Sequence, residues 1–348
     1  MPIPTEPIGS VPRPTALLEA MTSTNPDPAE LERQYDAALR DTIARFEETG
    51  SPVITDGEQT KPSFVTYPLS GDLQLAPDGV TIPFADGHTR QLPALAAGPF
   101  QYGVYADSYL SAALKHAKAR VKQAVIAPSA LSLLYPQQGI DGYSQEQFLA
   151  DLADQSEQDI RRCLNAGADS VQLDFTEGRL SVKLDPSKGI LNNFVALNNT
   201  VLDRFSDEER AKIGVHTCPG GDQDSTHSAD VDYAELLPSL FELHAGRFYV
   251  QLASETDRKR VLSVIREHRK PEQFVFVGVI DPIDPRVESA EEVRLRVLEA
   301  AEYIPADRLG SCDDCGFSPF GDDTSTSRDT AFAKVRARVE GTALADKG

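Results

Sequence analysis

The chain has 348 residues, 40 % of them hydrophobic, with four cysteines and no tryptophan; 54 acidic and 34 basic side chains give a net charge of −20. This length suits one large domain or two ordinary ones. So negative a chain repels phosphate backbones and anionic headgroups, which argues against nucleic-acid and membrane partners. The expected ligand is a small polar metabolite or a thiol.

The N-terminal stretch MPIPTEPIGS has neither the basic segment nor the apolar core of a signal peptide. No window of the sequence approaches the ~20 apolar residues that span a bilayer. We therefore expect a cytoplasmic protein. Four cysteines are too few for a disulfide framework, and in a reducing cytosol they are free to act as metal ligands or nucleophiles.

Short apolar runs alternate with longer segments of helical periodicity along the chain. The expected strands are Pro4–Gly9, Pro52–Asp56, Gln123–Ala127, Ser170–Asp174, Ile213–Thr217, Phe248–Ala253, Phe274–Ile280 and Arg308–Ser311. The main expected helices are Asp27–Thr49, Gln145–Ala166, Asp232–Leu243, Asp257–Arg269, Ala290–Tyr303 and Arg328–Glu340. This order predicts a parallel (β/α)8 TIM barrel as one catalytic domain over residues 1–348. An open doubly wound sheet is the alternative, although no glycine-rich nucleotide-binding turn follows any strand.

Residues 71–100 interrupt this alternation between the second and third expected strands. Apolar and polar residues alternate there on both sides of Asp78-Gly79. An Asp-Gly pair flanked by such alternation is typical of a β-hairpin. The sequence therefore predicts a hairpin excursion from the barrel in this region.

Reactive side chains follow two of the expected strands. The fifth strand ends in His216-Thr217-Cys218 and the eighth is followed by Cys315. Residues two apart in an extended segment point to the same side, so His216 and Cys218 can face one point. Cys315 can meet them, because the carboxyl ends of barrel strands share one face. One imidazole and two thiolates suit Zn²⁺ better than Mg²⁺ or Ca²⁺.

Other interpretations of these cysteines stay open. Cys312 and Cys315 could form a redox pair, although no thioredoxin-like βαβ context surrounds them. Cys218 and Cys315 could also be buried apolar residues without a ligand role. A purely structural zinc needs four protein ligands, whereas only three are clear here. The remaining position is open to a substrate thiol, which zinc would bind as a thiolate.

Short motifs in barrel order carry a family resemblance. They are Ile8-Gly9-Ser10, Asp56-Gly57-Glu58, Leu173-Asp174, His216-Thr217-Cys218, Gly278-Val-Ile-Asp281 and Asp314-Cys315-Gly316. With this set the whole chain resembles the C-terminal catalytic barrel of the cobalamin-independent methionine synthase family. The resemblance implies zinc-dependent methyl transfer to the thiol of homocysteine, giving methionine.

The resemblance also implies roles for individual residues. It makes His216, Cys218 and Cys315 zinc ligands, Ile8, Gly9 and Ser10 contacts of the amino-acid carboxylate, and Glu58 and Asp174 contacts of its ammonium group. Two unpaired carboxylates in a partly desolvated pocket would be costly, and a cationic substrate group would relieve that cost. This favours an amino-acid thiol over a sulfonate thiol such as coenzyme M.

Three further residues have weaker assignments. The family's fourth zinc ligand is a glutamate at the end of the sixth strand, and Glu255 lies one or two residues beyond that point. Glu255 could reach the metal only through a bulge or loop shift. His227, in a polar loop after Cys218, is a candidate general acid or an ordinary loop histidine. Asp281, at the end of the seventh strand, could orient substrate or cap the next helix.

The full-length synthases of this family carry a second, N-terminal barrel, which is not found in these 348 residues. Single-barrel relatives include methionine synthases with other methyl donors and enzymes that join an epoxyalkane to coenzyme M. The expected partners are therefore a small-molecule thiol, with homocysteine favoured, and a methyl or alkyl donor. The alternatives are transfer of another electrophile to another thiol and a non-catalytic barrel with a structural zinc.

Overall fold

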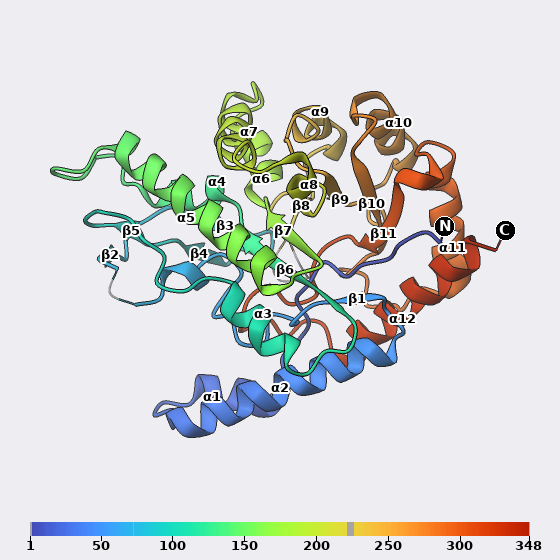
Figure 1. The fold of residues 1–348 in the computed structure, drawn as a ribbon, viewed down its shortest axis with the longest axis horizontal. Coiled ribbons are helices and arrows are strands. Elements are labelled where there is room, and N and C mark those ends of the chain that lie inside the picture. Colours follow the sequence, from blue (N-terminus) through green and yellow to red (C-terminus); the bar gives the residue numbers. More distant parts are fainter. Residues whose placement is uncertain (1, 72, 221–225, 348) are drawn as a thin grey trace.

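A computed structural model of the protein describes residues 2–71, 73–220 and 226–347. Its centre is a curled sheet of seven parallel strands in the order β1-β6-β7-β8-β9-β10-β11 (Figure 1). These strands are β1 (Val53–Ile54), β6 (Arg120–Ile126), β7 (Ser170–Asp174), β8 (Ile213–Thr217), β9 (Arg247–Val250), β10 (Phe274–Ile280) and β11 (Leu309–Asp313). The sequential strand order with parallel pairing is that of a (β/α)8 barrel.

The N-terminal segment fills the eighth position of the ring. On one side the backbone N–H of Glu6 donates to the carbonyl of Ser311 in β11, at 3.0 Å. On the other side the N–H of Val11 donates to the carbonyl of Gly57, just after β1, at 3.1 Å. The expected first strand is thus present as a single parallel bridge between Thr5 and Ser311. The predicted TIM-barrel fold is confirmed.

Helices surround the sheet (Figure 1). They are α1 (Thr15–Thr22), α2 (Pro28–Glu48), α3 (Asp107–Leu114), α4 (Pro128–Leu131), α5 (Gln145–Ala166), α6 (Glu177–Leu184), α7 (Gly189–Leu202), α8 (Asp207–Arg210), α9 (Leu237–Leu240), α10 (Arg258–His268), α11 (Ala290–Ala301) and α12 (Arg328–Ala345), with short 3₁₀ turns η1 (Tyr67–Leu69), η2 (Ser132–Leu134), η3 (Tyr233–Glu235) and η4 (Ala306–Arg308). Helix α5 has its predicted bounds, because Ser144 and Gln147 form a capping box at its start and Gly167 ends it with φ 100°.

The expected helix over residues 232–243 is divided into η3 and α9. Pro238 lies in the first turn of α9. Proline lacks a backbone N–H, so it is accepted at the start of a helix but interrupts the interior of one. The amphipathic pattern alone therefore overestimated the length of this helix.

The excursion at residues 71–100 is present, but its turn lies elsewhere than predicted. It contains the antiparallel pairs β2 (Leu75–Ala76) with β5 (Ala94–Leu95) and β3 (Thr81–Pro83) with β4 (Thr89–Gln91). The turn is made by Asp86-Gly87, with Gly87 at φ 95°. Asp78-Gly79 instead separates β2 from β3, and a Cβ at Gly79 would lie 2.1 Å from the carbonyl oxygen of Leu92. Gly79 is thus required by a close approach and not by a hairpin turn.

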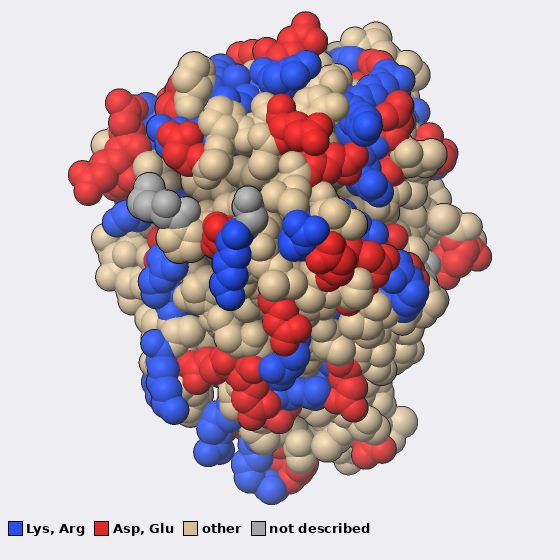
Figure 2. All heavy atoms as spheres, turned by 90° about the vertical axis from the view of Figure 1, so that its right-hand side faces the viewer, with Lys and Arg blue, Asp and Glu red and all other residues tan. Residues whose placement is uncertain are grey.

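The surface carries mixed charge despite the net charge of −20. Basic and acidic side chains are interspersed over the face in Figure 2. Ion pairs such as Arg258–Glu299, at 2.9 Å, and Arg294–Glu291, at 2.7 Å, join them on α10 and α11. Among the residues that the structure describes, no helix combines the length and the apolar character needed to cross a membrane.

Candidate functional site

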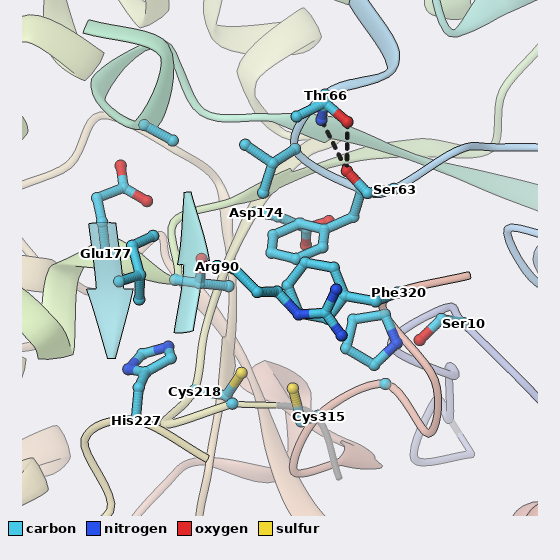
Figure 3. A pocket seen from close by; sticks show the side chains of 18 of the residues that line it. Ser10, Ser63, Thr66, Arg90, Asp174, Glu177, Cys218, His227, Cys315 and Phe320 are labelled. Atoms are coloured by element: carbon cyan, nitrogen blue, oxygen red, sulfur yellow. Dashed lines mark hydrogen bonds between the residues drawn. The ribbon is translucent and has the colours of Figure 1, made fainter. Parts of the chain in front are cut away.

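A cavity of about 440 Å³ opens at the carboxyl ends of the strands (Figure 3). Its walls come from the N-terminal segment, the ends of β7 and β8, the β3–β4 hairpin and the loop after β11. Of the residues predicted from the sequence, it is lined by Ile8, Gly9, Ser10, Glu58, Asp174, His216, Cys218, His227 and Cys315. The fold thus brings most of the predicted site residues, far apart in the chain, to one pocket.

His216, Cys218 and Cys315 form a compact group in this pocket. Each offers one ligand atom, these atoms all lie within 4.8 Å of one another, and all three residues are buried. Figure 3 shows the sulfur atoms of Cys218 and Cys315 on neighbouring loops. The Nε2 atom of His216 is buried and has no hydrogen-bond partner among the described residues. One free imidazole nitrogen and two sulfur atoms fit a metal site, and this donor set is typical of zinc.

The orientation of His216 is set by Asp174. The Nδ1 atom of His216 lies 3.2 Å from Oδ1 of Asp174, and Nε2 of Gln172 donates to the same oxygen at 2.8 Å. A histidine that binds metal through one ring nitrogen usually donates from the other to such a carboxylate. Asp174 therefore lies behind the metal-ligand group and leaves Nε2 of His216 facing it.

In the metal-free group the charged forms of Cys218 and His216 stabilise each other, so binding of a metal through Nε2 of His216 would displace a proton. Burial alone would raise the pKa of Cys218, but a hydrogen bond from Cys315 and the charge of His216 lower it to about 5. Burial opposes the charged form of His216, yet Cys218 and Asp174 together raise its pKa to about 10. Burial and the adjacent Cys218 raise the pKa of Cys315. Cys218 is thus held as a thiolate, which is the form that binds metals.

Glu58 lines the pocket but is not an unpaired carboxylate. Its Oε1 atom accepts from Nζ of Lys61 at 3.1 Å, and the same ammonium donates to the carbonyl of Ala124 at 2.9 Å. Glu58 and Lys61 are both buried. The expectation that Glu58 and Asp174 are two unpaired charges is therefore wrong, because each already has a partner within the chain.

The Ile8-Gly9-Ser10 segment lies against the loop that carries Cys315. A Cβ on Gly9 would meet no atom within 4 Å, so open space lies beside this backbone. The Oγ atom of Ser10 accepts from the N–H of Ser318 at 3.2 Å. A Cβ on Gly316 would lie 2.1 Å from that Oγ, so a larger residue directly after Cys315 would displace the Ser10 hydroxyl.

Glu255 is not brought to the metal-ligand group. Its carboxylate binds Nη1 of Arg179 at 2.8 Å. The loop before it is fixed because Asp314 accepts three backbone N–H groups, those of Leu252, Ala253 and Ser254. This anchoring holds the loop after β9 in a conformation in which Glu255 faces Arg179.

Asp281 lies outside the pocket lining, and its Oδ1 atom accepts from the N–H of Ile283 at 2.9 Å.

His227 does line the pocket, and its Nδ1 atom is buried without a partner among the described residues. Burial and the charge of Arg179 lower the pKa of His227 to about 4. A neutral imidazole is a poor proton donor, which disfavours the general-acid role. Residues 221–225 of the predicted polar loop lie outside the described residues.

Sequence reasoning missed Glu177, the first residue of α6. It lines the pocket and is buried, its Oε1 atom accepts from the hydroxyl of Ser129, and its Oε2 atom has no partner among the described residues. Burial raises its pKa to about 8. An acidic residue in the first turn of a helix is ordinarily solvated and stabilises the helix N-terminus. Only the tertiary structure therefore identifies Glu177 as a pocket residue.

Replacing Glu177 by glutamine should stabilise the protein at pH of about 8. Between about 4.5 and about 8 the unfolded chain releases this proton while the folded protein keeps it, so the free energy of unfolding falls as the pH rises. Glutamine keeps the acceptor for Ser129 and has no proton to lose. We expect a gain of the order of 3 kcal/mol at pH of about 8 that vanishes near pH 4. Denaturant unfolding between pH 4 and about 8 measures this gain in the free energy of unfolding. The matched control is Glu302→Gln, because Glu302 is exposed. A gain that does not depend on pH would contradict the raised pKa of Glu177.

Comparisons with known proteins identify the family of the chain. The family model described as the catalytic domain of cobalamin-independent synthases matches residues 3–340. A methionine synthase from Saccharolobus solfataricus is 23 % identical over 346 residues, 98 % of this chain and 94 % of the relative. A 5-methyltetrahydropteroyltriglutamate–homocysteine methyltransferase from Nitratidesulfovibrio vulgaris is 25 % identical over 97 % of this chain, which spans 42 % of that relative.

Among solved structures, a B12-independent methionine synthase from a Shewanella species superposes with a TM-score of 0.78. It is 21 % identical, with 100 % of this chain and 98 % of that chain covered, and it supports the fold. A 2-hydroxypropyl-CoM lyase from Xanthobacter autotrophicus is 38 % identical over 84 residues, 24 % of this chain. The resemblance inferred from the sequence motifs is confirmed, and the chain belongs to the family of cobalamin-independent synthase catalytic domains.

Proposed function

We propose that this protein is a zinc-dependent methyltransferase that acts on the thiol of homocysteine. The observation that carries this proposal is the group of His216, Cys218 and Cys315, buried at the wall of an open pocket and with no fourth protein ligand among the described residues. When bound there, zinc would lower the pKa of a substrate thiol so that a thiolate is present at neutral pH.

The pocket walls around this group supply contacts for the rest of an amino-acid thiol. Glu58 and Asp174 place negative charge beside the metal-ligand group, and the open space beside Gly9 gives a carboxylate access to the backbone. The substrate ammonium would share Glu58 with Lys61 rather than neutralise a free pair of acids. This arrangement favours an amino-acid thiol over a sulfonate thiol, because the ammonium group of an amino acid can bind the Glu58 carboxylate and a sulfonate anion cannot.

The reaction is a displacement at carbon. The thiolate sulfur forms a bond to the methyl carbon while the bond from that carbon to the donor breaks, and the donor keeps the electron pair. The chain orients the two reactants and limits the access of water. Aromatic rings close the outer wall of the pocket: Phe84 and Phe320 have ring centroids 6.1 Å apart, and the guanidinium of Arg90 lies 3.8 Å from the centroid of Phe320.

Homocysteine should add one sulfur ligand to the metal. X-ray absorption at the zinc edge, measured before and after homocysteine is added, should show two sulfur ligands rising to three, because a catalytic site keeps an exchangeable position and a structural site does not. An unchanged spectrum would mean a closed structural zinc.

A panel of thiols and donors tests the substrates. Homocysteine and coenzyme M are each assayed with methyltetrahydrofolate, methylcobalamin and an epoxyalkane, and product formation is measured. We expect homocysteine with a methyl donor to give the highest kcat/KM. Preference for coenzyme M with the epoxide would instead support transfer of another electrophile, the activity that the partial match to the CoM lyase suggests.

A further inference from the structure

The centre of the barrel contains a buried lysine that the proposed reaction does not use. Lys122 lies in β6, is fully buried, and its Nζ atom lies 4.0 Å from the ring centroid of Tyr249. Its nearest polar contact is Oε1 of Gln172, at 2.8 Å. Glu6 is farther away, at 3.7 Å, and its carboxylate is already bound by Arg247 at 3.1 Å and by the hydroxyl of Tyr249 at 2.7 Å.

A continuous chain of hydrogen bonds leads from this lysine to the metal-ligand group. Lys122 Nζ donates to Gln172 Oε1 at 2.8 Å, Gln172 Nε2 donates to Asp174 Oδ1 at 2.8 Å, and His216 Nδ1 lies 3.2 Å from that same oxygen. All four residues are buried. The chain crosses three neighbouring strands, because β6, β7 and β8 are adjacent in the sheet.

Lys122 at one end and Asp174 at the other fix the direction of the hydrogen bonds in this chain. An ammonium group can only donate, so the carbonyl oxygen of the Gln172 amide faces Lys122 and its NH₂ group must face Asp174. An ionised Asp174 can only accept, so Nδ1 of His216 carries the proton directed at it. In the neutral ring, which is the form that binds a metal, the lone pair is then on Nε2, and this nitrogen has no hydrogen-bond partner among the described residues.

We propose that Lys122 is a positioning residue of the metal site, which acts through Gln172 and Asp174 to keep Nε2 of His216 available for the metal. The inference rests on the metal centre proposed above. Without the ammonium, the Gln172 oxygen loses the donor that holds it, so the amide is free to turn away from Asp174 and the N–H donated to Asp174 is no longer fixed in place. The bond that orients His216 would then weaken.

The test compares metal affinity in variants of the full chain. Lys122→Met and Gln172→Met each remove a link while keeping an unbranched side chain in the barrel. Zinc affinity is measured by competition with a chelator, on protein shown to be folded by circular dichroism. We expect each variant to bind zinc about tenfold more weakly, as for other partners that lie behind metal ligands. The double variant should bind no more weakly than Gln172→Met alone, since both residues act through one chain.

Lys334→Met is the matched control. Lys334 is also fully buried, and its Nζ atom is held by Glu288 Oε2 at 2.8 Å and by the carbonyl of Asp281 at 2.9 Å, so within the described part of the chain its partners lie outside the metal-ligand group. Its zinc affinity should equal that of the wild type even though a buried lysine is lost. Lys122→Gln replaces Lys122→Met if the latter does not fold, with a loss in the same direction expected.

A second measurement reports on geometry rather than affinity. In protein labelled with ¹⁵N-histidine and loaded with zinc, the chemical shifts of the His216 ring should identify Nε2 as the metal-bound nitrogen in the wild type and a mixture in Lys122→Met. Wild-type affinity in Lys122→Met, an equal loss in Lys334→Met, or additive losses in the double variant would each overturn the inference. Absence of zinc binding in the wild type would overturn the proposed metal centre as well, whereas absence of methyl transfer alone would leave this test unaffected.

Discussion

Replacing Cys218 by serine should remove zinc from the protein and abolish methyl transfer. Cys218 is the residue of the metal-ligand group whose pKa is lowered, to about 5, so it supplies the thiolate of the proposed site. A serine hydroxyl stays protonated at neutral pH and is a poor zinc ligand. We expect the zinc content to fall from about one ion per chain to near zero. Since a catalytic metal contributes several kcal/mol, kcat/KM should fall at least about a thousandfold.

Cys312→Ser is the matched control for this experiment. Cys312 is also buried, in β11 and three residues before Cys315, but its Sγ atom contacts the carbonyl of Phe276, at 3.5 Å, and it does not belong to the metal-ligand group. This variant should keep its zinc and most of its activity. Elemental analysis and a homocysteine assay on the same preparations give both readouts. A Cys218→Ser protein that retains zinc and turns over substrate would refute the proposed centre.

Replacing Lys61 by methionine should destabilise the fold strongly. Its side chain is 1 % exposed, and its ammonium binds the buried carboxylate of Glu58 at 3.1 Å and the carbonyl of Ala124 at 2.9 Å and lies 4.9 Å from the ring centroid of Tyr67. Removing one partner of a buried ion pair leaves the other charge uncompensated, which costs about 3–5 kcal/mol. Adding Glu58→Gln to this variant removes the stranded charge, so the double variant should recover a large part of that loss.

The loss should also depend on pH. Burial raises the pKa of Glu58 above its ordinary value, and Lys61 partly offsets this effect. Without Lys61 the pKa of Glu58 rises further, so in acid the carboxyl becomes neutral and the stranded charge disappears. The loss in the free energy of unfolding of Lys61→Met relative to the wild type is therefore largest at pH values above the folded-state pKa of Glu58. It becomes smaller as the pH falls through that pKa. Urea unfolding of the wild type, both single variants and the double variant over a range of pH measures this; a deficit that is the same at all pH values would contradict the ion-pair explanation.

The sequence by itself was sufficient where the physical cause is local. The bounds of α5 follow from a capping box and a terminal glycine within the helix itself. The bounds of β8 were predicted from a short apolar run, while the strand expected over Arg308–Ser311 extends to Asp313 as β11. Given parallel strands, the barrel topology then places His216, Cys218 and Cys315 on one face, so the metal-ligand group followed from sequence order alone.

Only the tertiary structure decided which charges are paired, because the partners come from separate strands and loops. Asp314 fixes the loop that turns Glu255 toward Arg179. Burial in the wall of the pocket raises the pKa of Glu177, unlike that of a solvated acid at a helix N-terminus. The chain from Lys122 to His216 crosses adjacent strands in two steps of 50 and 42 residues in sequence, so no local pattern signals it. Composition and periodicity indicate which chemistry a residue can perform and which local structure it favours. Which partner it contacts depends on distances that are set only when the barrel has folded.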